Sequence, residues 1–421
     1  MKAPKNRRVF VIGYGAATPL GVDFIRTWQR AVKGEAGLCK ITRCEVHTSA
    51  DVVGEIPGWD PEQLCFASKK DAYNWNAAFV MLTIAVCKEA LENAGLEMNN
   101  ETGPRTACLI GSAINGSDAM RVAVENLKGR GPMRVSPYLL PNLCANVPAG
   151  KAGILLGFTG PIFSPQGACA SGNHAIGIGA HMIRDGDCDF VLAGGVDMPL
   201  MPEIIQGFAN MNATIKINER DRAFADPNKA SRPFSLDSKG FVLSEGGAVL
   251  VLAAEEMLTL YGITPRAEIM GVGWTSDAHH FIRPNKKTVT RSIVEAIDDA
   301  GLKPADISNV NAHGTSTPTG DATEIECLRT VFGTRLGDIP ISSNKSQIGH
   351  TLGAAAAIEA ALIIEGMRHG VMLPTINYLH DPQFDGLDFV PNIARRQQHE
   401  ITLSNAFGFG GTNCCIVFRG T

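Results

Sequence analysis

Cys169 is the residue whose type and neighbours point most strongly to chemistry. It stands in Gly-Ala-Cys-Ala-Ser-Gly at 167–172, after a predicted strand at 160–163 and before a helical run that reaches Ile183. A cysteine at such a turn lies beside the unpaired N–H groups and the partial positive charge of a helix N-terminus. Both features favour the thiolate over the thiol. We therefore predict that Cys169 is a nucleophile.

The other cysteines fit structural positions. Cys87 and Cys108 lie within apolar segments, and Cys188 leads into a predicted strand. The chain has 11 cysteines and no C-x-x-C pair, which argues against a disulfide framework and against a zinc ribbon. This usage predicts free thiols and a cytoplasmic location.

Two histidines share a setting comparable to that of Cys169. His313 follows a predicted strand in Asn-Ala-His-Gly-Thr-Ser-Thr-Pro, and His350 ends Ser-Asn-Lys-Ser-Gln-Ile-Gly-His at the start of an alanine-rich run. Strand ends in α/β proteins are where concave sites form. The alternative is that both are structural histidines in ordinary turns. No H-x-x-x-H motif or matching carboxylate spacing joins them, so we predict no metal site.

A glycine-rich segment, Asn-Ala-Phe-Gly-Phe-Gly-Gly-Thr-Asn, occupies 405–413. Gly408, Gly410 and Gly411 allow the backbone to approach a ligand closely and to donate N–H groups. The P-loop lysine and the G-x-G-x-x-G spacing are absent, which excludes a phosphate-binding interpretation. An ordinary turn between two strands explains the segment equally well.

The elements that must position these residues alternate between short apolar runs and longer helical segments. This alternation predicts βα units that feed a buried, mostly parallel sheet. The second half repeats the first, because Ala-Leu-Glu-Asn-Ala-Gly-Leu at 90–96 resembles Ala-Ile-Asp-Asp-Ala-Gly-Leu at 296–302, and 11–15 resembles 269–273. We infer a duplicated α/β architecture with halves at 1–257 and 258–421. Chance similarity of common helix ends is the alternative.

Residues 210–237 carry many charges and little periodicity. They are predicted to form a long surface excursion, which serves as a lid or a docking loop, or else as a plain solvated connection.

Composition excludes several classes of protein. The 421 residues are 45% hydrophobic and 19% charged, which rules out a disordered or fibrous chain. A formal net charge of −4 offers no basic field for nucleic acid. The longest apolar stretch, 353–364, is interrupted by Glu359 and is shorter than a membrane span requires. No nucleic-acid or membrane partner is expected, and the basic N-terminus lacks the apolar run of a secretory signal.

The four motifs, in this order, resemble the β-ketoacyl-acyl-carrier-protein synthases of the synthase I/II type. The likeness extends from about Val9 to Phe418. It implies a thiolase fold, in which two similar halves form a five-layered αβαβα structure, usually in a homodimer. It also implies an acyltransferase that condenses a cysteine-bound acyl group with malonyl-acyl-carrier protein and releases carbon dioxide.

The resemblance also implies a role for particular residues. Cys169 is the acylated nucleophile, while His313 and His350 assist decarboxylation and condensation. Phe409 is a gate between Gly408 and Gly410, and the N–H groups of Cys169 and Phe409 form an oxyanion hole. The remaining roles are a structural ion pair of Lys345 with Glu359, pantetheine contacts at Thr315 and Thr317, and a limit on acyl length at Ile114.

Some positions depart from the common pattern of the family. Gln166, Asn344 and the pair at 347–348 leave the chemistry intact but leave open whether the pathway makes fatty acids, polyketides or polyenes. Only Lys69 and Lys70 stand where the family often gathers basic residues against its acidic carrier protein. No cofactor is expected, because the pantetheine arm arrives with the substrate.

Three alternatives to a complete condensing enzyme stay open at this stage. The first is that the chain is the catalytic subunit of a heterodimer with a chain-length factor. A non-catalytic partner subunit is disfavoured by Cys169. A thiolase is disfavoured because its second catalytic cysteine belongs in the glycine loop, where this chain has Phe409.

Overall fold

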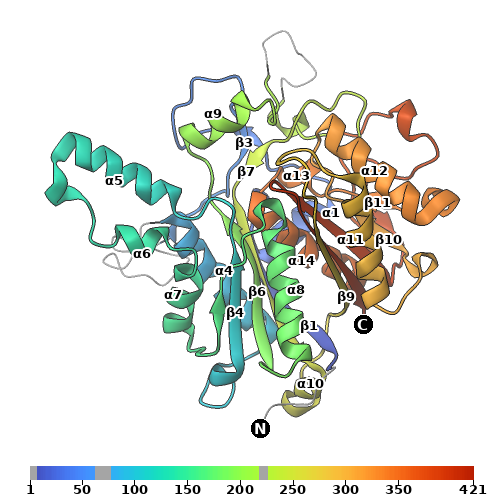
Figure 1. Cartoon of the computed structure of the whole chain (residues 1–421), viewed down its shortest axis with the longest axis horizontal. Helices are drawn as coiled ribbons and strands as arrows, with labels where there is room; N and C mark the ends of the chain where they lie inside the picture. Colours follow the sequence, from blue (N-terminus) through green and yellow to red (C-terminus); the bar gives the residue numbers. More distant parts are fainter. Residues whose placement is uncertain (1–6, 62–76, 218–225) are drawn as a thin grey trace.

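The computed structural model describes residues 7–61, 77–217 and 226–421. Its main sheet has ten strands in the order β11-β10-β14-β15-β9-β1-β8-β6-β4-β5. The central strands read as almost uninterrupted apolar runs and are buried over their whole length, as expected for a sheet covered on both faces. Figure 1 shows helices packed along this sheet, with α5 projecting to one side.

The first half of the chain contains β1 (Val9–Ala17), α1 (Phe24–Val32), β2 (Cys39–Lys40), β3 (Val52–Gly54), α4 (Ala78–Ala94), β4 (Thr106–Gly111), α5 (Ser117–Arg130), α6 (Leu139–Leu143), α7 (Val147–Leu156), β5 (Ile162–Phe163), α8 (Ser171–Arg184), β6 (Phe190–Asp197), α9 (Pro202–Asn210), β7 (Leu243–Ser244) and β8 (Gly246–Ala254). The second half contains α10 (Glu255–Tyr261), β9 (Ala267–Ser276), α11 (Lys286–Asp299), β10 (Asn309–Asn311), α12 (Pro318–Phe332), β11 (Ile341–Ser342), α13 (Lys345–Ile348), α14 (Ala355–His369), β12 (Val371–Met372), β13 (Arg395–Arg396), β14 (Ile401–Gly408) and β15 (Thr412–Gly420).

The repeat seen in the sequence is also a repeat of packing. In each half, two glycines of the first long strand lie against two alanines of the helix that packs on it, α4 in the first half and α11 in the second, so closely that a Cβ on the glycine would collide with helix backbone. The contacts are Gly13 with Ala94, Gly15 with Ala90, Gly271 with Ala300, and Gly273 with Ala296. These equivalent contacts explain why both sequence matches occur together.

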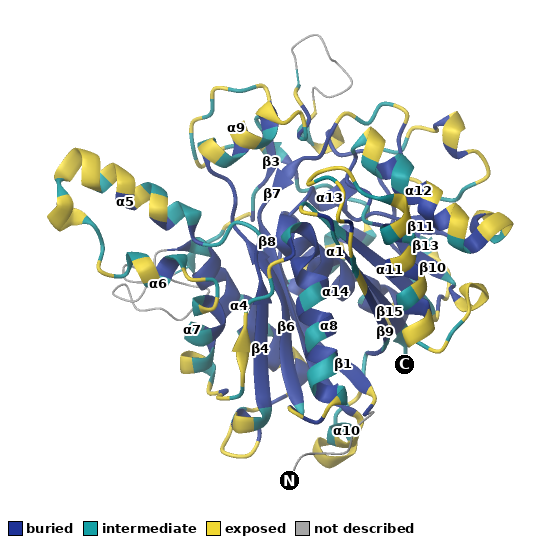
Figure 2. Cartoon of the chain, in the orientation of Figure 1, coloured by how far each residue is buried: buried dark blue, intermediate teal, exposed yellow. Residues whose placement is uncertain are grey.

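The layers follow from which helices contact which strands. α4 and α7 cover the outer face of the β5-β4-β6-β8-β1 half. α11 covers the outer side of the other half, and α12 packs beside α11. α8 and α14 lie between, because each contacts strands of both halves. The predicted five-layered thiolase fold is therefore confirmed. The prediction of a mostly parallel sheet is wrong, because the central strand β1 pairs antiparallel with β8 and also with β9, where the halves join. Figure 2 shows the buried strands and the half-buried α8. The division after residue 257 falls inside α10 and stays a prediction.

The predicted surface excursion is wrong for its second part. Residues 230–235 are buried, because this segment packs under the loop that carries His313. The Arg232 N–H donates to Ser316 Oγ at 2.9 Å, and the Phe234 side chain belongs to the core beneath. Because the residues around this segment are charged, nothing in the sequence indicated that residues 230–235 would be buried. Residues 218–225 lie outside the described part of the chain.

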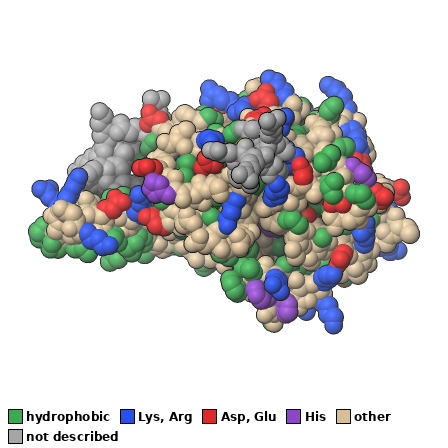
Figure 3. Space-filling model, turned by 90° about the horizontal axis from the view of Figure 1, so that it is seen from above, with side chains coloured by type: hydrophobic (Ala, Val, Ile, Leu, Met, Phe, Trp, Pro, Cys, Tyr) green, Lys and Arg blue, Asp and Glu red, His purple; other side chains and the backbone are tan. Residues whose placement is uncertain are grey.

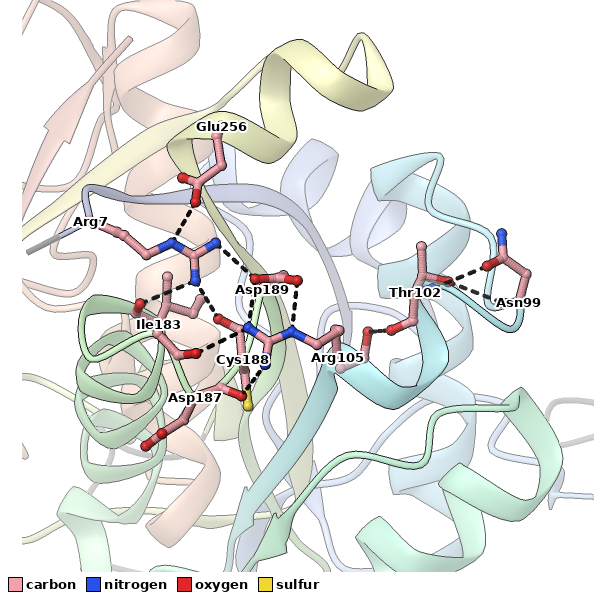
Figure 4. Close-up of polar contacts among 11 residues, drawn as sticks. Arg7, Asn99, Thr102, Arg105, Ile183, Asp187, Cys188, Asp189 and Glu256 are labelled. Carbon is pink, nitrogen blue, oxygen red and sulfur yellow. Dashed lines mark hydrogen bonds and ion pairs between the residues drawn. The ribbon is translucent and has the colours of Figure 1, made fainter. Parts of the chain in front are cut away.

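An ionic cluster around the buried side chain of Arg7 fixes the strand ends at the far end of α8 from Cys169. Arg7 donates to Asp189 at 2.8 Å and to Glu256 at 2.7 Å, and Arg105 donates to the same Asp189 at 2.8 Å (Figure 4). Arg7 also donates to the carbonyl of Cys188 at 2.8 Å. These ion pairs and the carbonyl contact make the burial of the Arg7 charge tolerable. In the described part of the chain, no helix is long and apolar enough to cross a membrane.

Candidate active site

Cys169 lies on a tight turn between a strand and a helix, as the sequence predicts. β5 ends at Phe163, a single 3-10 turn spans 168–170, and α8 begins at Ser171. Ala168 has a φ of +48°, a conformation that costs energy for a residue with a Cβ. The turn is held by the Gly167 N–H, which donates to Ser171 Oγ at 2.9 Å. This strain presents the Cys169 side chain to the cavity described below.

The two histidines converge on this sulfur from the other half of the chain. His350 follows α13, and its Nε2 lies 3.1 Å from Cys169 Sγ. His313 follows β10, and its ring centre lies 5.6 Å from that of His350. Phe241 packs edge-on against His350 at 5.3 Å and holds the ring in place. The fold therefore brings together three residues that the sequence separates by up to 181 positions.

Burial decides the protonation states of these groups. It raises the pKa of the Cys169 thiol to about 12, although Lys345 and the N–H groups of Phe409 and Cys169 oppose the shift. Burial, with the charge of Lys345, holds the pKa values of His313 and His350 well below 6.5. The expectation of a resting thiolate is therefore wrong: desolvation outweighs the helix N-terminus, and the site holds a thiol beside neutral imidazoles.

Lys345 and Glu359 form the ion pair that the resemblance implies. Both side chains are only 1% exposed. Asn311 Nδ2 donates to the second oxygen of Glu359 at 3.4 Å and to Ser404 Oγ at 3.2 Å. The pair joins α13 to α14, and it places a positive charge close to Cys169 and the two histidines.

The glycine-rich segment is both a hairpin turn and part of the site. Residues 409–411 connect β14 to β15. A Cβ on Gly408 would lie 2.2 Å from the Gly167 carbonyl, so only glycine allows the loop to lie against the nucleophile turn. Thr412 Oγ1 donates to the same carbonyl at 2.8 Å. The exposed Gly410, with φ of +84°, donates its N–H to the Phe281 carbonyl at 2.7 Å.

A cavity of about 480 Å³ opens above the sulfur. Ile114 and Phe208, which pack in one cluster with Cys169, line it together with Thr315 and Thr317. The two threonine hydroxyls are hydrogen-bonded at 2.8 Å. Phe409 also lines the cavity, with its ring 6.4 Å from that of Phe208. The cavity is thus apolar beside Cys169 and polar at the threonine pair.

Three buried carboxylates that position the site were missed from the sequence. Glu324 accepts the N–H groups of His313 at 2.9 Å and Gly314 at 2.8 Å. Asp321 accepts the Phe234 N–H at 2.8 Å, and Asp197 accepts that of Ile114 at 3.0 Å. The spacing of Asp321 and Glu324 by three residues, just after the His313 motif, was the available signal. Asp197 offered none, because its partners are distant in the sequence.

Two further expectations concern the basic residues Lys69 and Lys70 and the absence of a metal site. Lys69 and Lys70 lie outside the described residues. Within the described ranges, no group of three or more histidine, cysteine or acidic side chains is arranged to hold a metal ion.

The geometry defines a thiolase-fold acyltransferase site: a buried thiol, a histidine pair and backbone donors in one cavity. Comparison with known proteins gives the family. The model of the β-ketoacyl synthase N-terminal domain matches residues 6–257, and that of the C-terminal domain matches 266–379. The chain belongs to the β-ketoacyl synthase family and is an acyltransferase of the ketosynthase type.

Its relatives agree over the full length. The chain is 36% identical to 3-oxoacyl-[acyl-carrier-protein] synthase 2 of Staphylococcus aureus strain N315, covering 99% of each protein. It is 35% identical to the Coxiella burnetii protein of the same name, covering 98% of each. Among solved structures, a type II polyketide ketosynthase in complex with its acyl-carrier protein superposes with a TM-score of 0.90 at 27% identity, covering 99% of this chain and 100% of the other. The ishigamide ketosynthase/chain length factor gives 0.89 at 28% identity, with the same coverage.

Proposed function

We propose that this chain condenses an acyl group bound to Cys169 with a malonyl group on an acyl carrier protein, giving carbon dioxide and a 3-oxoacyl-carrier protein. The observation that carries the proposal is the Sγ–Nε2 distance of 3.1 Å between Cys169 and His350. A buried thiol needs a proton acceptor at this distance before it can attack a thioester.

In the first step, Cys169 Sγ bonds to the acyl carbon and the bond to the pantetheine sulfur breaks. The thiol proton passes through His350 to the departing pantetheine sulfur. The backbone N–H groups of Phe409 and Cys169 face the sulfur, where they can stabilise the oxyanion. The free carrier thiol then leaves.

In the second step, the malonyl thioester loses carbon dioxide, and the electron pair of the broken bond forms an enolate. His313 and His350 are neutral and can donate N–H bonds to the enolate oxygen without any strong base. For His350 this step requires the tautomer with the proton on Nε2, because the proton that Nε2 accepted in the first step has already left with the pantetheine thiol. The carbon then attacks the acyl carbonyl, and Cys169 regains its thiol by taking up one proton.

The test is a product assay with purified protein, an acetyl-carrier protein and a malonyl-carrier protein. We expect 3-oxobutyryl-carrier protein and one carbon dioxide for each product molecule. Carbon dioxide without the 3-oxo product would contradict a condensing enzyme. No reaction until a chain-length factor is added would favour the heterodimeric form of the enzyme.

Ile114 is predicted to limit the length of the acyl chain. It is half-buried in the cavity wall, and it packs in one cluster with Cys169. Ile114→Phe should block long acyl chains and spare acetyl transfer, because a packed wall has no space for extra volume. Ile114→Ala should admit longer chains at a stability cost of about 2 kcal/mol. The measurement is self-acylation with chains of graded length, and an unchanged profile in both folded variants would leave Ile114 as mere packing.

The pH profile should show no histidine titration near neutrality. A histidine of pKa ~6.5 would be mostly protonated at about pH 6. In this site the lowered pKa values keep both imidazoles neutral there, so decarboxylation should decline only as the pH falls well below 6.5. The rate with a malonyl-pantetheine substrate, measured from about pH 5 to 8, tests this, since an inflection near 6.5 would show ordinary histidines.

We propose a homodimer because exposed apolar side chains on α5 and α7 accompany β5, the strand at the open edge of the main sheet. β5 is the last strand of the sheet, and its Phe163 is 50% exposed. Large apolar side chains are also exposed on α5 and α7, including Leu127 and Ile154. Figure 3 shows hydrophobic side chains gathered along one edge of the projecting lobe. Exposed apolar patches of this kind commonly mark protein–protein interfaces, and an open strand edge can pair with a strand of another chain.

The oligomeric state tests this proposal. We expect a dimer by mass photometry, converted to monomer by Phe163→Asp and preserved in Ile25→Asp, a matched control at an exposed apolar position on α1. A monomer that assembles only with a chain-length factor would instead support the heterodimer. The absence of a cofactor, of a nucleic-acid partner and of a membrane partner, and the cytoplasmic location, stay predictions.

A further inference from the structure

Asp197 is a buried carboxylate whose hydrogen bonds reach two separate walls of the catalytic cavity. It is the last residue of β6, and its surface is fully covered. β4 runs parallel beside β6, with Gly111 paired to Gly195, so the two strands end side by side. The carboxyl ends of neighbouring parallel strands are where sites form in α/β proteins, because the segments that follow them meet at one edge of the sheet.

The first wall is the segment that follows β4 and carries Ile114. The Ser112 hydroxyl donates to Asp197 Oδ1 at 2.6 Å. The N–H groups of Ala113 and Ile114 donate to the same carboxylate at 2.9 Å and 3.0 Å. Asn115 has a φ of +53°, a region that asparagine enters more readily than most side chains, and its N–H donates to Ser112 Oγ at 2.9 Å. These bonds fix the backbone from which Ile114 lines the cavity.

The second wall is the turn that follows His350. The Gly353 N–H donates to Asp197 Oδ2 at 2.7 Å. A Cβ on Gly353 would lie only 2.7 Å from this oxygen, so glycine is required for the turn to approach the carboxylate so closely. Leu352, between the two, lines the cavity with a φ of +51°. The turn that places His350 beside the sulfur is thus anchored on the carboxylate that holds the first wall.

An amide cannot replace this carboxylate. Oδ1 accepts the Ile114 N–H and Oδ2 accepts the Gly353 N–H, so either orientation of an asparagine would direct an NH2 group at a hydrogen-bond donor. Burial raises the pKa of Asp197 to about 6 although the donors oppose the shift, so the group is ionised at about pH 8. Bonds to an ionised acceptor are about twice as strong as neutral ones. Exchange for asparagine should therefore loosen both walls.

We propose that Asp197 is a positioning residue that sets the acyl-chain selectivity of the cavity, by holding the Ile114 wall and the turn after His350 at a fixed separation. This inference rests on the proposed function, because it takes the acyl chain to lie beside Ile114 and His350 to accept the thiol proton. The room for a long chain depends on the Ile114 wall, and the hydrogen bonds to Asp197 oppose its movement. Chain-length selectivity and proton transfer then depend on one shared anchor.

The test compares octanoyl-carrier protein with acetyl-carrier protein as donors to Cys169 at about pH 8, where Asp197 is ionised. The ratio of the two kcat/KM values does not depend on how much of the protein is folded, so lost stability alone cannot change it. We expect Asp197→Asn to raise the octanoyl-to-acetyl ratio by about tenfold, because the wall yields. Acetyl transfer itself should slow by about tenfold, because the His350 turn loses its anchor.

Glu89→Gln is the matched control. The Glu89 carboxylate also accepts two backbone N–H groups, at 2.8 Å and 2.7 Å, but Glu89 lies on α4 and outside the cavity lining. This variant should lose stability and keep the native octanoyl-to-acetyl ratio.

Two further variants locate the effect. Ser112→Ala removes one donor on the Ile114 side and leaves the carboxylate in place, so the ratio should rise by about threefold while acetyl transfer stays near the native rate. When Asp197→Asn is combined with Ile114→Ala, the ratio should rise by less than the product of the two single effects, because both changes act on the same wall.

The outcomes separate this inference from the function on which it rests. A native ratio in folded Asp197→Asn, or in Ser112→Ala if Asp197→Asn does not fold, would overturn the positioning role and leave the condensing enzyme standing. Single effects that multiply fully would show that Asp197 does not act through Ile114 and would contradict the proposal as well. Acylation of the native protein by neither donor would instead remove the proposed function.

Discussion

Cys169→Ala is expected to abolish acyl transfer to the protein. Among the residues that the structure describes, no nucleophile other than this sulfur combines a strained turn, a histidine nitrogen at 3.1 Å and two backbone N–H groups directed at it. Removing it leaves no atom to form the acyl bond, so the loss should be complete to the limit of detection. Incubation with acetyl-carrier protein and intact mass spectrometry measure it directly, since the native protein gains one acetyl group and the variant none.

The matched control is Cys144→Ala. Cys144 is exposed at the end of α6, so it is the more accessible thiol, yet it lacks the surroundings of Cys169. We expect Cys144→Ala to acylate at the native rate. An acetyl group on Cys144 or Cys414 in the Cys169→Ala protein, at a rate near the native one, would show that the nucleophile has been misassigned.

His313→Ala and His350→Ala should both lose condensation by at least a hundredfold, because each removes a donor to the enolate. Their effects on acylation should differ. His350 touches the sulfur and accepts its proton, so acylation in His350→Ala should also slow by about a hundredfold. His313 lies one ring further away and should leave acylation within about tenfold of the native rate.

Two assays on the same protein separate these steps: the rate of acetyl adduct formation, and carbon dioxide release from malonyl-carrier protein. His313→Gln and His350→Gln, which keep a side-chain N–H, serve as controls for the donor role and should recover part of the decarboxylation. Full condensing activity in either alanine variant would refute the assignment. Equal acylation in the two alanine variants would show that His350 is not the proton acceptor.

The sequence was informative where a functional feature depends on residues that follow one another along the chain. The Cys169 turn follows from a strand, small residues and a helix in immediate succession, and the structure has all three. The duplication could be detected because the same glycines and alanines must pack in both halves. The family motifs added the fold and the roles, which neither spacing nor composition provides.

What could not be predicted depends on contacts between distant segments. Asp197 is 84 residues from Ala113, whose N–H it accepts, and nothing near it in the chain marks it as a carboxylate that shapes the cavity. The anchoring of 230–235 under the His313 loop was hidden for the same reason. The protonation state of Cys169 was also predicted wrongly, because a helix N-terminus is visible in the sequence whereas desolvation by other segments is not.

The most direct test of the condensing role is a chase of the acyl-enzyme. The protein is first acetylated with labelled acetyl-carrier protein, separated from the donor, and then mixed with malonyl-carrier protein. We predict that peptide mapping finds the label on Cys169 before the chase, and that the label then moves into 3-oxobutyryl-carrier protein with one carbon dioxide per acetyl group lost. A label that stays on Cys169, or that leaves it as free acetate while carbon dioxide is released, would contradict the assignment of this chain as a condensing enzyme.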